Sequence, residues 1–293
     1  MDFSLWIENA AYRSLTEEVS VTPKPGLVDL WDTGAHQDMD YRTFLVSAAA
    51  IAPYMGEMAE LGRRRWRNAE RIFEEARAAG TEAERSMFRA TGGINTHKGA
   101  VFLLGILCMA AGMVYEKYGF LKKERIFLTA AGAAGPCLTK EMKRILSGTA
   151  ETHGEKLLVQ YGVTGIRGEV QKAFPSLRYY GMPALRKGEA ESWGRNERNM
   201  YILLALMANV DDTNVLSRTG IQGLFYMRKR AERVLKKLDH PDRFQREMLI
   251  MNYEFMERNI SPGGCADLLA ATILTDEMEK AWGSCSRRRM AGF

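Results

Sequence analysis

The stretch AVFLLGILCMAAGMV, residues 100–114, is the most apolar part of the chain and decides how the fold is interpreted. It is about 15 residues long, whereas a helix needs roughly 20 apolar residues to cross a bilayer. It also runs directly into Tyr115, Glu116 and Lys117. We therefore expect a buried central helix and no membrane span.

Helical periodicity continues on both sides of this stretch. Apolar residues recur at spacings of three and four in 7–20, 40–61, 122–135, 198–210, 223–238, 241–259 and 263–283. Residues 66–80 end on Gly80, as a helix with a glycine C-cap does. The best strand candidate, LLVQYGV at 157–163, is weak. The pattern predicts an all-α fold, a single large multi-helix domain over residues 1–293.

One region interrupts the pattern. Glycines and prolines recur between residues 147 and 196, without the composition of a free linker. This predicts a broken helical segment, and a lid over a site is one interpretation of it.

Composition limits the class of protein and of partner. The 293 residues are 46% hydrophobic and 26% charged, which is ordinary for a soluble globular protein. The net charge of +5 favours an anionic partner such as a nucleotide, a coenzyme or a nucleic acid. No aromatic platform accompanies the arginine runs at 63–67 and 287–289, which favours solvated faces over nucleic-acid patches. Four separated cysteines and no signal peptide favour a reduced, cytoplasmic protein.

The stretch TPKPGLVD, residues 22–29, is unusual in a chain of helix formers. Its two prolines stiffen the backbone around Lys24, and Gly26 permits a sharp change of direction. It is either a rigid turn between helices or a wall that presents Lys24 and Asp29 to a ligand.

Four further stretches place small residues beside charges at helix junctions: DTGAHQDMD (32–40), TGGINTHKGA (91–100), NVDDTNVLSRTG (209–220) and NISPGGCADLLA (259–270). In the second, Asn95 or Thr96 can cap a helix whose first turn holds His97 and Lys98, two residues that oppose its dipole unless an anion binds there. Each stretch also has a simpler interpretation, as a capped helix start or a solvated turn.

The number of such junctions favours a nucleotide pocket. Carboxylates at helix ends suit Mg²⁺, which takes few carboxylates and completes its shell with phosphate oxygens and water. Cationic side chains and glycine-rich helix starts suit a polyphosphate. No GxxxxGK[ST] motif occurs, so this is no P-loop.

These five stretches, in this order and at these intervals, resemble the triphosphoribosyl-dephospho-CoA synthases, over about residues 18–267. The resemblance implies that ATP acts as a glycosyl donor to the 2′-hydroxyl of 3′-dephospho-CoA, with release of adenine. The product would be a prosthetic-group precursor for citrate lyase or malonate decarboxylase. It would pass to an acyl-carrier-protein phosphoribosyl transferase.

Roles within the motifs follow from residue chemistry and the implied reaction. The predicted Mg²⁺ ligands are Asp211, Asp212 and Asp267. The predicted substrate-binding residues are Lys24, Asp29, Asn95, Thr96, Lys98, Asn214, Arg218, Gly263 and Gly264. The catalytic candidates are Glu18 and Asp38, as base or oxocarbenium stabiliser, and His36 and His97, at the leaving base.

Two other functions stay open at this stage. A Mg²⁺-dependent N-glycoside hydrolase of a nucleotide or ADP-ribose group would use water in place of the 2′-hydroxyl. A non-catalytic helical protein would bind a nucleotide or CoA without turnover. Neither the oligomeric state nor the number of metal ions follows from the sequence.

Overall fold

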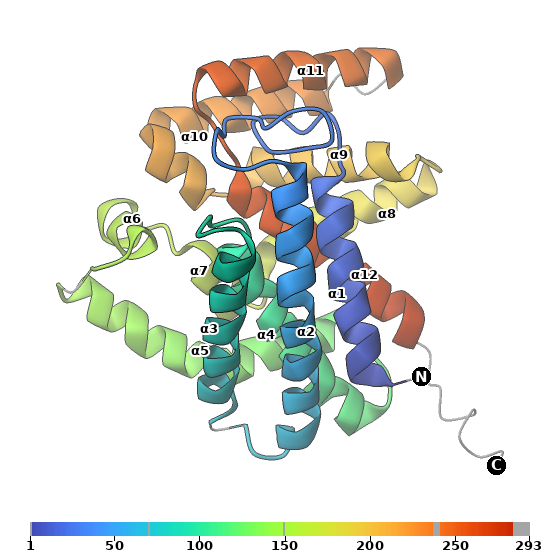
Figure 1. Cartoon of the computed structure of the whole chain (residues 1–293), viewed down its shortest axis with the longest axis vertical. Helices are drawn as coiled ribbons and strands as arrows, with labels where there is room; N and C mark the ends of the chain where they lie inside the picture. Colours follow the sequence, from blue (N-terminus) through green and yellow to red (C-terminus); the bar gives the residue numbers. More distant parts are fainter. Residues whose placement is uncertain (1, 70, 149, 237–240, 284–293) are drawn as a thin grey trace.

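The protein is described here from a computed structural model that covers residues 2–69, 71–148, 150–236 and 241–283 (Figure 1). Within these ranges the regular elements are helices and there is no strand, which confirms the all-α prediction. In chain order they are α1 (Phe3–Val19), α2 (Tyr41–Arg65), α3 (Ile72–Ala90), α4 (Lys98–Tyr118), α5 (Lys123–Leu146), α6 (His153–Tyr161), α7 (Gly165–Gln171), η1 (Leu177–Gly181), α8 (Met182–Ala190), α9 (Arg195–Asn209), α10 (Thr213–Leu235), α11 (Pro241–Glu257) and α12 (Gly263–Trp282).

Helix α4 is the centre of the hydrophobic core, as its sequence predicts. It is the one described helix long and apolar enough to span a membrane, but 78% of its apolar stretch is buried inside the protein. It packs closely against α2, where a Cβ on Gly62 would lie 2.0 Å from the Met109 carbonyl oxygen. A Cβ on Gly112 would lie equally close, 2.0 Å, to the Ala59 carbonyl oxygen. The absence of side chains at these two glycines lets the two backbones touch.

One local prediction is wrong. Helix α3 does not end at Gly80 but continues to Ala90. Its buried face, which includes Ala76, Ala83 and Met87, packs on both sides of the glycine, so tertiary packing overrides a local stop signal. The weak strand candidate at 157–163 lies largely in α6.

The region between 147 and 196 is a series of short helices, as its glycines and prolines predict. Helices α6, α7, η1 and α8 replace one long helix. Leu177, Met182 and Leu185 are buried, so η1 and α8 belong to the core. The predicted lid stays a prediction. Cys285 and the arginine run at 287–289 lie outside the described residues.

The polar junctions gather at one end of the helices. In Figure 1 the loop between α1 and α2 lies at the upper end of both helices, beneath α10 and α11. The turn between α3 and α4 lies toward the same end. Segments that are far apart in the sequence therefore become neighbours there.

Candidate active site

The loop that follows α1 carries a buried ion pair. Lys24 is 1% exposed and its Nζ lies 2.8 Å from Glu18 Oε1. The same ammonium donates to the Glu18 carbonyl oxygen at 3.3 Å. The lysine between two prolines is therefore turned inward onto the last turn of α1.

Asp29 holds this loop together. Its carboxylate accepts hydrogen bonds from the backbone N–H groups of Lys24 (2.9 Å), Trp31 (2.7 Å) and Asp32 (3.1 Å), and the residue is 2% exposed. The structure thus assigns Asp29 to loop geometry, whereas the sequence predicts a ligand contact. The rigid-turn interpretation accounts for these hydrogen bonds, and the predicted ligand contact of Asp29 stays a prediction.

The loop docks on the residues before α12. A Cβ on Gly26 would lie 2.1 Å from the Ile260 carbonyl oxygen, and φ is +72° there, so glycine is required twice over. His36 Nε2 lies 2.8 Å from Ser261 Oγ. Arg218 ties three segments together, donating to the carbonyl oxygens of Ala35 at 2.5 Å and Asn259 at 3.2 Å.

Asp212 joins the start of α10 to the start of α12. Its Oδ1 accepts from the backbone N–H groups of Asn214 (2.9 Å) and Val215 (3.2 Å), as an N-cap does. Its Oδ2 accepts from the Cys265 N–H at 2.8 Å. The protein's own carboxylate therefore occupies part of the glycine-rich helix start that the sequence offers to a phosphate.

The two glycines of that helix start are also closely packed. The Gly263 N–H donates to the Ser261 carbonyl oxygen at 3.0 Å. A Cβ on Gly263 would lie 2.5 Å from Asn214 Nδ2, and one on Gly264 would lie 3.0 Å from Asp212 Oδ2. Asn214, which is exposed, thus packs against the opening turn of α12.

Asp267 faces the start of α4. A Cβ on Gly99 would lie 2.0 Å from Asp267 Oδ2, so only glycine leaves room for this carboxylate. The Ala100 N–H stabilises its ionised form. Burial nevertheless raises the pKa of Asp267 well above its usual range, and the nearby charges of Glu18 and Asp212 add to the shift. Asp267 is therefore a carboxylate whose charge is poorly compensated by the protein.

His97 lies two residues before Gly99, at the N-cap position of α4. Its Nδ1 lies 2.7 Å from Ser47 Oγ, and Thr96 Oγ1 donates to the same Ser47 oxygen at 2.6 Å. Its Nε2 is buried and has no hydrogen-bond partner in the part of the chain that the structure describes. Burial, with a smaller effect of the Lys24 charge, lowers the pKa of His97 to about 3.

The remaining titratable groups respond to the same surroundings. Burial raises the pKa of Glu18, and Lys24 opposes that shift. Burial likewise raises the pKa of Asp212, against its three N–H donors. Burial lowers the pKa of His36, and the charge of Arg218 lowers it further. The three carboxylates and two histidines thus share one electrostatically coupled region, in which Glu18, Asp212 and His97 are buried while Asp267 and His36 are partly exposed.

Some predicted residues lie outside this cluster. The exposed Lys98 points its Nζ to Glu84 at 3.2 Å, and Asp211 pairs with Arg228 at 2.8 Å. Asp38 is 64% exposed at its side chain, 3.9 Å from His36 Nδ1. Asn95 is not the N-cap of α4, although its Oδ1 accepts the Lys98 N–H at 3.3 Å. The N-cap is His97, and the Thr96 hydroxyl donates to Ser47 of α2.

A three-carboxylate metal site does not form in the part of the chain that the structure describes, where no three His, Cys, Asp or Glu side chains gather as ligands. Asp211 is engaged by Arg228 and both oxygens of Asp212 are engaged by N–H groups. Asp267 is the carboxylate best placed for a cation.

Sequence reasoning missed three polar residues that build the site. Ser47 lies inside the helical stretch FLVSAAA, and the only signal is a polar residue on a buried face. Asn252 of α11 accepts the Gly26 N–H at 2.9 Å and donates to Asp32 at 2.9 Å. Ser261 contacts His36. Only the packed structure brings these residues to the loop.

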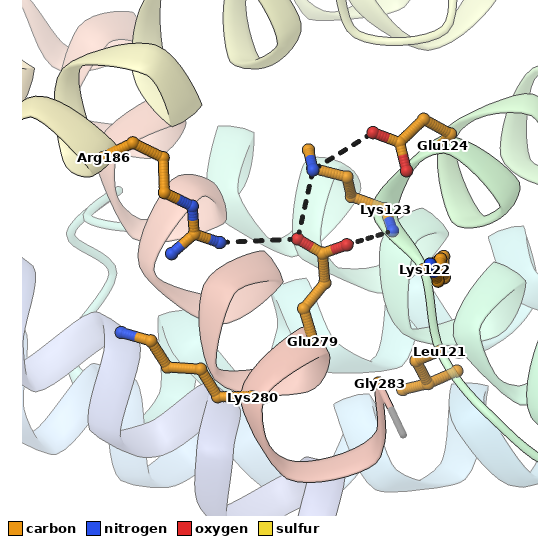
Figure 2. Close-up of a pocket in the computed structure, with 8 residues that line it drawn as sticks. All are labelled: Leu121, Lys122, Lys123, Glu124, Arg186, Glu279, Lys280 and Gly283. Carbon is orange, nitrogen blue, oxygen red and sulfur yellow. Dashed lines mark hydrogen bonds and ion pairs between the residues drawn. The ribbon is translucent and has the colours of Figure 1, made fainter. Parts of the chain in front are cut away.

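A separate pocket lies at the other end of α12, roughly 30 Å from Gly263 by helix rise. Figure 2 shows Glu279 at its centre, between Lys123 and Arg186. Glu279 accepts the Lys123 N–H at 2.9 Å and lies 3.4 Å from Lys123 Nζ and 3.6 Å from Arg186. These ion pairs join α5, α8 and α12.

Known proteins identify the family. A family model described as CitG: ATP:dephospho-CoA triphosphoribosyl transferase matches residues 4–286. A probable 2-(5″-triphosphoribosyl)-3′-dephosphocoenzyme-A synthase of Vibrio cholerae is 36% identical over 277 residues, 93% of this chain and 88% of the relative. The synthase of Escherichia fergusonii is 36% identical, over 94% of this chain and 91% of the relative. The probable synthase of Albidiferax ferrireducens is 37% identical, over 95% and 92%.

No solved structure matches the chain. The family match covers all five junction motifs, and these relatives align over nearly their whole lengths. The chain therefore belongs to the CitG family of ATP:dephospho-CoA triphosphoribosyl transferases.

Proposed function

We propose that this protein transfers the triphosphoribosyl group of ATP to the 2′-hydroxyl of 3′-dephospho-CoA and releases adenine. The bond between ribose C1′ and the adenine ring breaks, and a bond from the acceptor oxygen to C1′ forms. The triphosphate stays on the transferred ribose. The observation that carries the proposal is that five separated motifs converge with Glu18 on one cluster, to which they contribute Lys24, His36, His97, Asp212 and Asp267.

Glu18 is the proposed general base for the acceptor hydroxyl. Burial raises its pKa while Lys24, 2.8 Å away, favours the ionised form. A carboxylate with a raised pKa is a better proton acceptor than an ordinary exposed one. Asp38, the other candidate from the sequence, has a side chain that is 64% exposed, so it lacks the buried environment of Glu18.

Asp267 is the proposed stabiliser of positive charge. An oxocarbenium-like transition state gains from a nearby carboxylate. Asp267 has room only because residue 99 is a glycine, and it has no cationic partner among the described residues that would cancel its charge. The same feature fits a Mg²⁺ ion, which takes one or two carboxylates and fills its shell with phosphate oxygens and water. Such an ion would neutralise the charge of the triphosphate.

Arg218 is the proposed phosphate contact. Its guanidinium bonds to carbonyl oxygens of Ala35 and Asn259, which position it without cancelling its charge. Lys24 is less suited to that role than the sequence predicts, because its charge is directed to Glu18. His36, held by Ser261 beside Arg218, completes this edge of the cluster.

The product of the proposed reaction would be the substrate of a second enzyme. Its chemistry, a ribosyl triphosphate on dephospho-CoA, suits a transferase that attaches the group to an acyl carrier protein. A cytoplasmic location agrees with three described cysteines, all of which are free. Whether citrate lyase or malonate decarboxylase uses the product depends on proteins other than this one.

The test is adenine release from ATP with Mg²⁺, with and without 3′-dephospho-CoA, followed by the mass of the coupled product. Release that requires the acceptor supports the proposal. Release without it would make the protein an N-glycoside hydrolase, and binding without release would make it a carrier. Asp267→Asn should lower the rate about 100-fold or more. Glu82→Gln, which changes an exposed carboxylate paired with Arg85, is the matched control.

A further inference from the structure

Three side chains form a hydrogen-bonded chain that ends on a ring nitrogen of His97. Thr96 Oγ1 donates to Ser47 Oγ at 2.6 Å, and Ser47 Oγ lies 2.7 Å from His97 Nδ1. Ser47 is completely buried and His97 is 3% exposed. Water therefore does not compete for these contacts.

The direction of this chain determines where the imidazole proton lies. Ser47 already accepts a hydrogen bond from Thr96, so its own hydroxyl proton is directed to another acceptor. Within the described residues, the bonds of the Ser47 hydroxyl reach only Thr96 and His97. Ser47 therefore donates to Nδ1. A neutral imidazole carries one proton, and Nδ1 is the acceptor, so the proton is on Nε2.

His97 is neutral because burial lowers its pKa to about 3. A neutral N–H donates a hydrogen bond but is far too weak an acid to give up its proton. Nε2 is buried, and none of the described residues accepts a hydrogen bond from it. The free-energy cost of removing this donor from water is therefore not offset by a hydrogen bond within the described structure. The edge of the Phe44 ring, with centroids 4.9 Å apart, holds the imidazole in this position.

We propose that Ser47 is a positioning residue that, with Thr96, holds His97 in its Nε2–H form, and that His97 donates this N–H to an acceptor atom of bound ATP. The inference rests on the proposed function and deepens it, because it makes His97 a fixed hydrogen-bond donor and not the acid that protonates adenine. No proton leaves the ring during the reaction. The donor stabilises electron density on either a ring nitrogen of the leaving base or a phosphate oxygen.

Nitrogen NMR of the wild-type protein tests the first half without any activity measurement. Long-range ¹H–¹⁵N correlation spectra separate protonated from unprotonated ring nitrogens, and His97→Gln identifies the His97 signals among the four histidines. We expect a proton on Nε2 and none on Nδ1 between pH 5 and pH 8. A proton on Nδ1, or titration of the ring in that range, overturns the proposal.

Two pairs of variants test the role in the reaction. A glutamine at position 97 can still donate from nearly the same place, so His97→Gln should keep activity within about tenfold of wild type, while His97→Leu should lose roughly 100-fold. Equal losses in both variants overturn the donor role.

Ser47→Ala should lower the turnover number roughly 10–100-fold and give a mixture of imidazole tautomers in the spectra. Ser14→Ala removes another fully buried hydroxyl, which bonds to the Ala11 carbonyl of its own helix, and should do neither. A Ser47→Ala protein whose tautomer is unchanged also overturns the proposal.

Titration with adenosine and with inorganic triphosphate identifies the acceptor. A shift of the Nε2–H signal with adenosine assigns the base, and a shift with triphosphate assigns a phosphate oxygen. ATP itself is titrated as well, and its binding is measured by calorimetry. If ATP binds and neither ATP, adenosine nor triphosphate shifts the Nε2–H signal, the proposal fails. If no adenine is released from ATP by the wild type, the proposed function fails, while the tautomer result stands separately.

Discussion

Lys24 and Glu18 make the most buried ion pair of the candidate site, with side-chain exposures of 2% and 4%. Removing a charge from such a pair leaves the other charge buried and uncompensated, which costs more than the pair contributes. The pair is a structural feature of the loop as well as a proposed part of the chemistry. Stability and activity should therefore respond differently to single and double substitutions.

Lys24→Met should lower the free energy of unfolding by about 3–5 kcal/mol, because Glu18 then loses the one cationic partner that it has among the described residues. The double variant Glu18→Gln, Lys24→Met should recover most of that loss, since neither side chain is then charged. Urea denaturation at pH 7 measures both, and adenine release should remain low in both. If the Lys24→Met protein were as stable as wild type, water would have to reach the Glu18 carboxylate in the variant.

His97 should make the protein sensitive to mild acid. Its pKa is about 3 when folded, against 6.5 as the ordinary value. The unfolded chain therefore binds a proton between pH 6.5 and pH 3 that the folded protein does not, so stability falls as the pH falls through this range. At pH 5 the cost is about 2 kcal/mol relative to neutral pH.

Comparison with His97→Gln isolates this contribution, because the other groups are common to both proteins. Urea unfolding at pH 7 and pH 5 should show a loss about 2 kcal/mol smaller in the variant. Equal losses in the two proteins would show that the folded state accepts the proton near the ordinary pKa.

At the scale of elements, the central pair of helices depends on two missing side chains. Helices α2 and α4 meet where Gly62 and Gly112 face carbonyl oxygens of the opposite helix. Backbone atoms cannot rotate away as a side chain can, so an added methyl group must separate the helices. The start of α4 carries His97 and Gly99, and its position depends on this packing.

Gly112→Ala should therefore destabilise the protein by about 1–3 kcal/mol, as overpacking does. Gly132→Ala is the matched control, because it lies in α5 and a Cβ there meets no atom within 4 Å. Alanine favours a helix over glycine, so the control should gain about 0.5–1 kcal/mol. Thermal and urea unfolding of the two variants should move in opposite directions.

At the scale of the whole molecule, the site is held together by contacts between distant segments. Glu18, Asp212 and Asp267 come from α1, the start of α10 and α12, and all three have raised pKa values, chiefly because of burial. A raised carboxylate pKa contributes stability at low pH that is lost as the pH rises through the folded value. A bound cation would offset that loss by replacing the protons.

Mg²⁺ with ATP should consequently stabilise the protein more at pH 8 than at pH 6. A ligand concentration of 100 times the dissociation constant raises the free energy of unfolding by about 2.7 kcal/mol. Asp267→Asn should be more stable than wild type at pH 8 without ligand, because a poorly compensated buried charge is gone. It should also lose most of the Mg²⁺ effect. Thermal unfolding with and without ligand at both pH values measures these differences, and an effect independent of pH would contradict the expectation.

The sequence by itself determined the fold class, the central helix and the five motifs of the site. Apolar periodicity and helix-end chemistry are local properties, and both can be recognised along a single stretch of chain. The same reasoning failed at Gly80, where packing of α3 on its neighbours outweighs the local preference of one glycine. It also placed Asp29 and Asp211 toward a ligand, although partners from their surroundings engage them.

Only the tertiary structure decided which polar side chains share the site and in what state. Ser47 shows in the sequence only as a polar residue on a buried helix face, yet it contacts His97, 50 residues away along the chain. Asp267 acquires its raised pKa from burial and from charges on two other elements. Such properties depend on the distance between groups and on the exclusion of water. Both arise only when separate helices pack around one core.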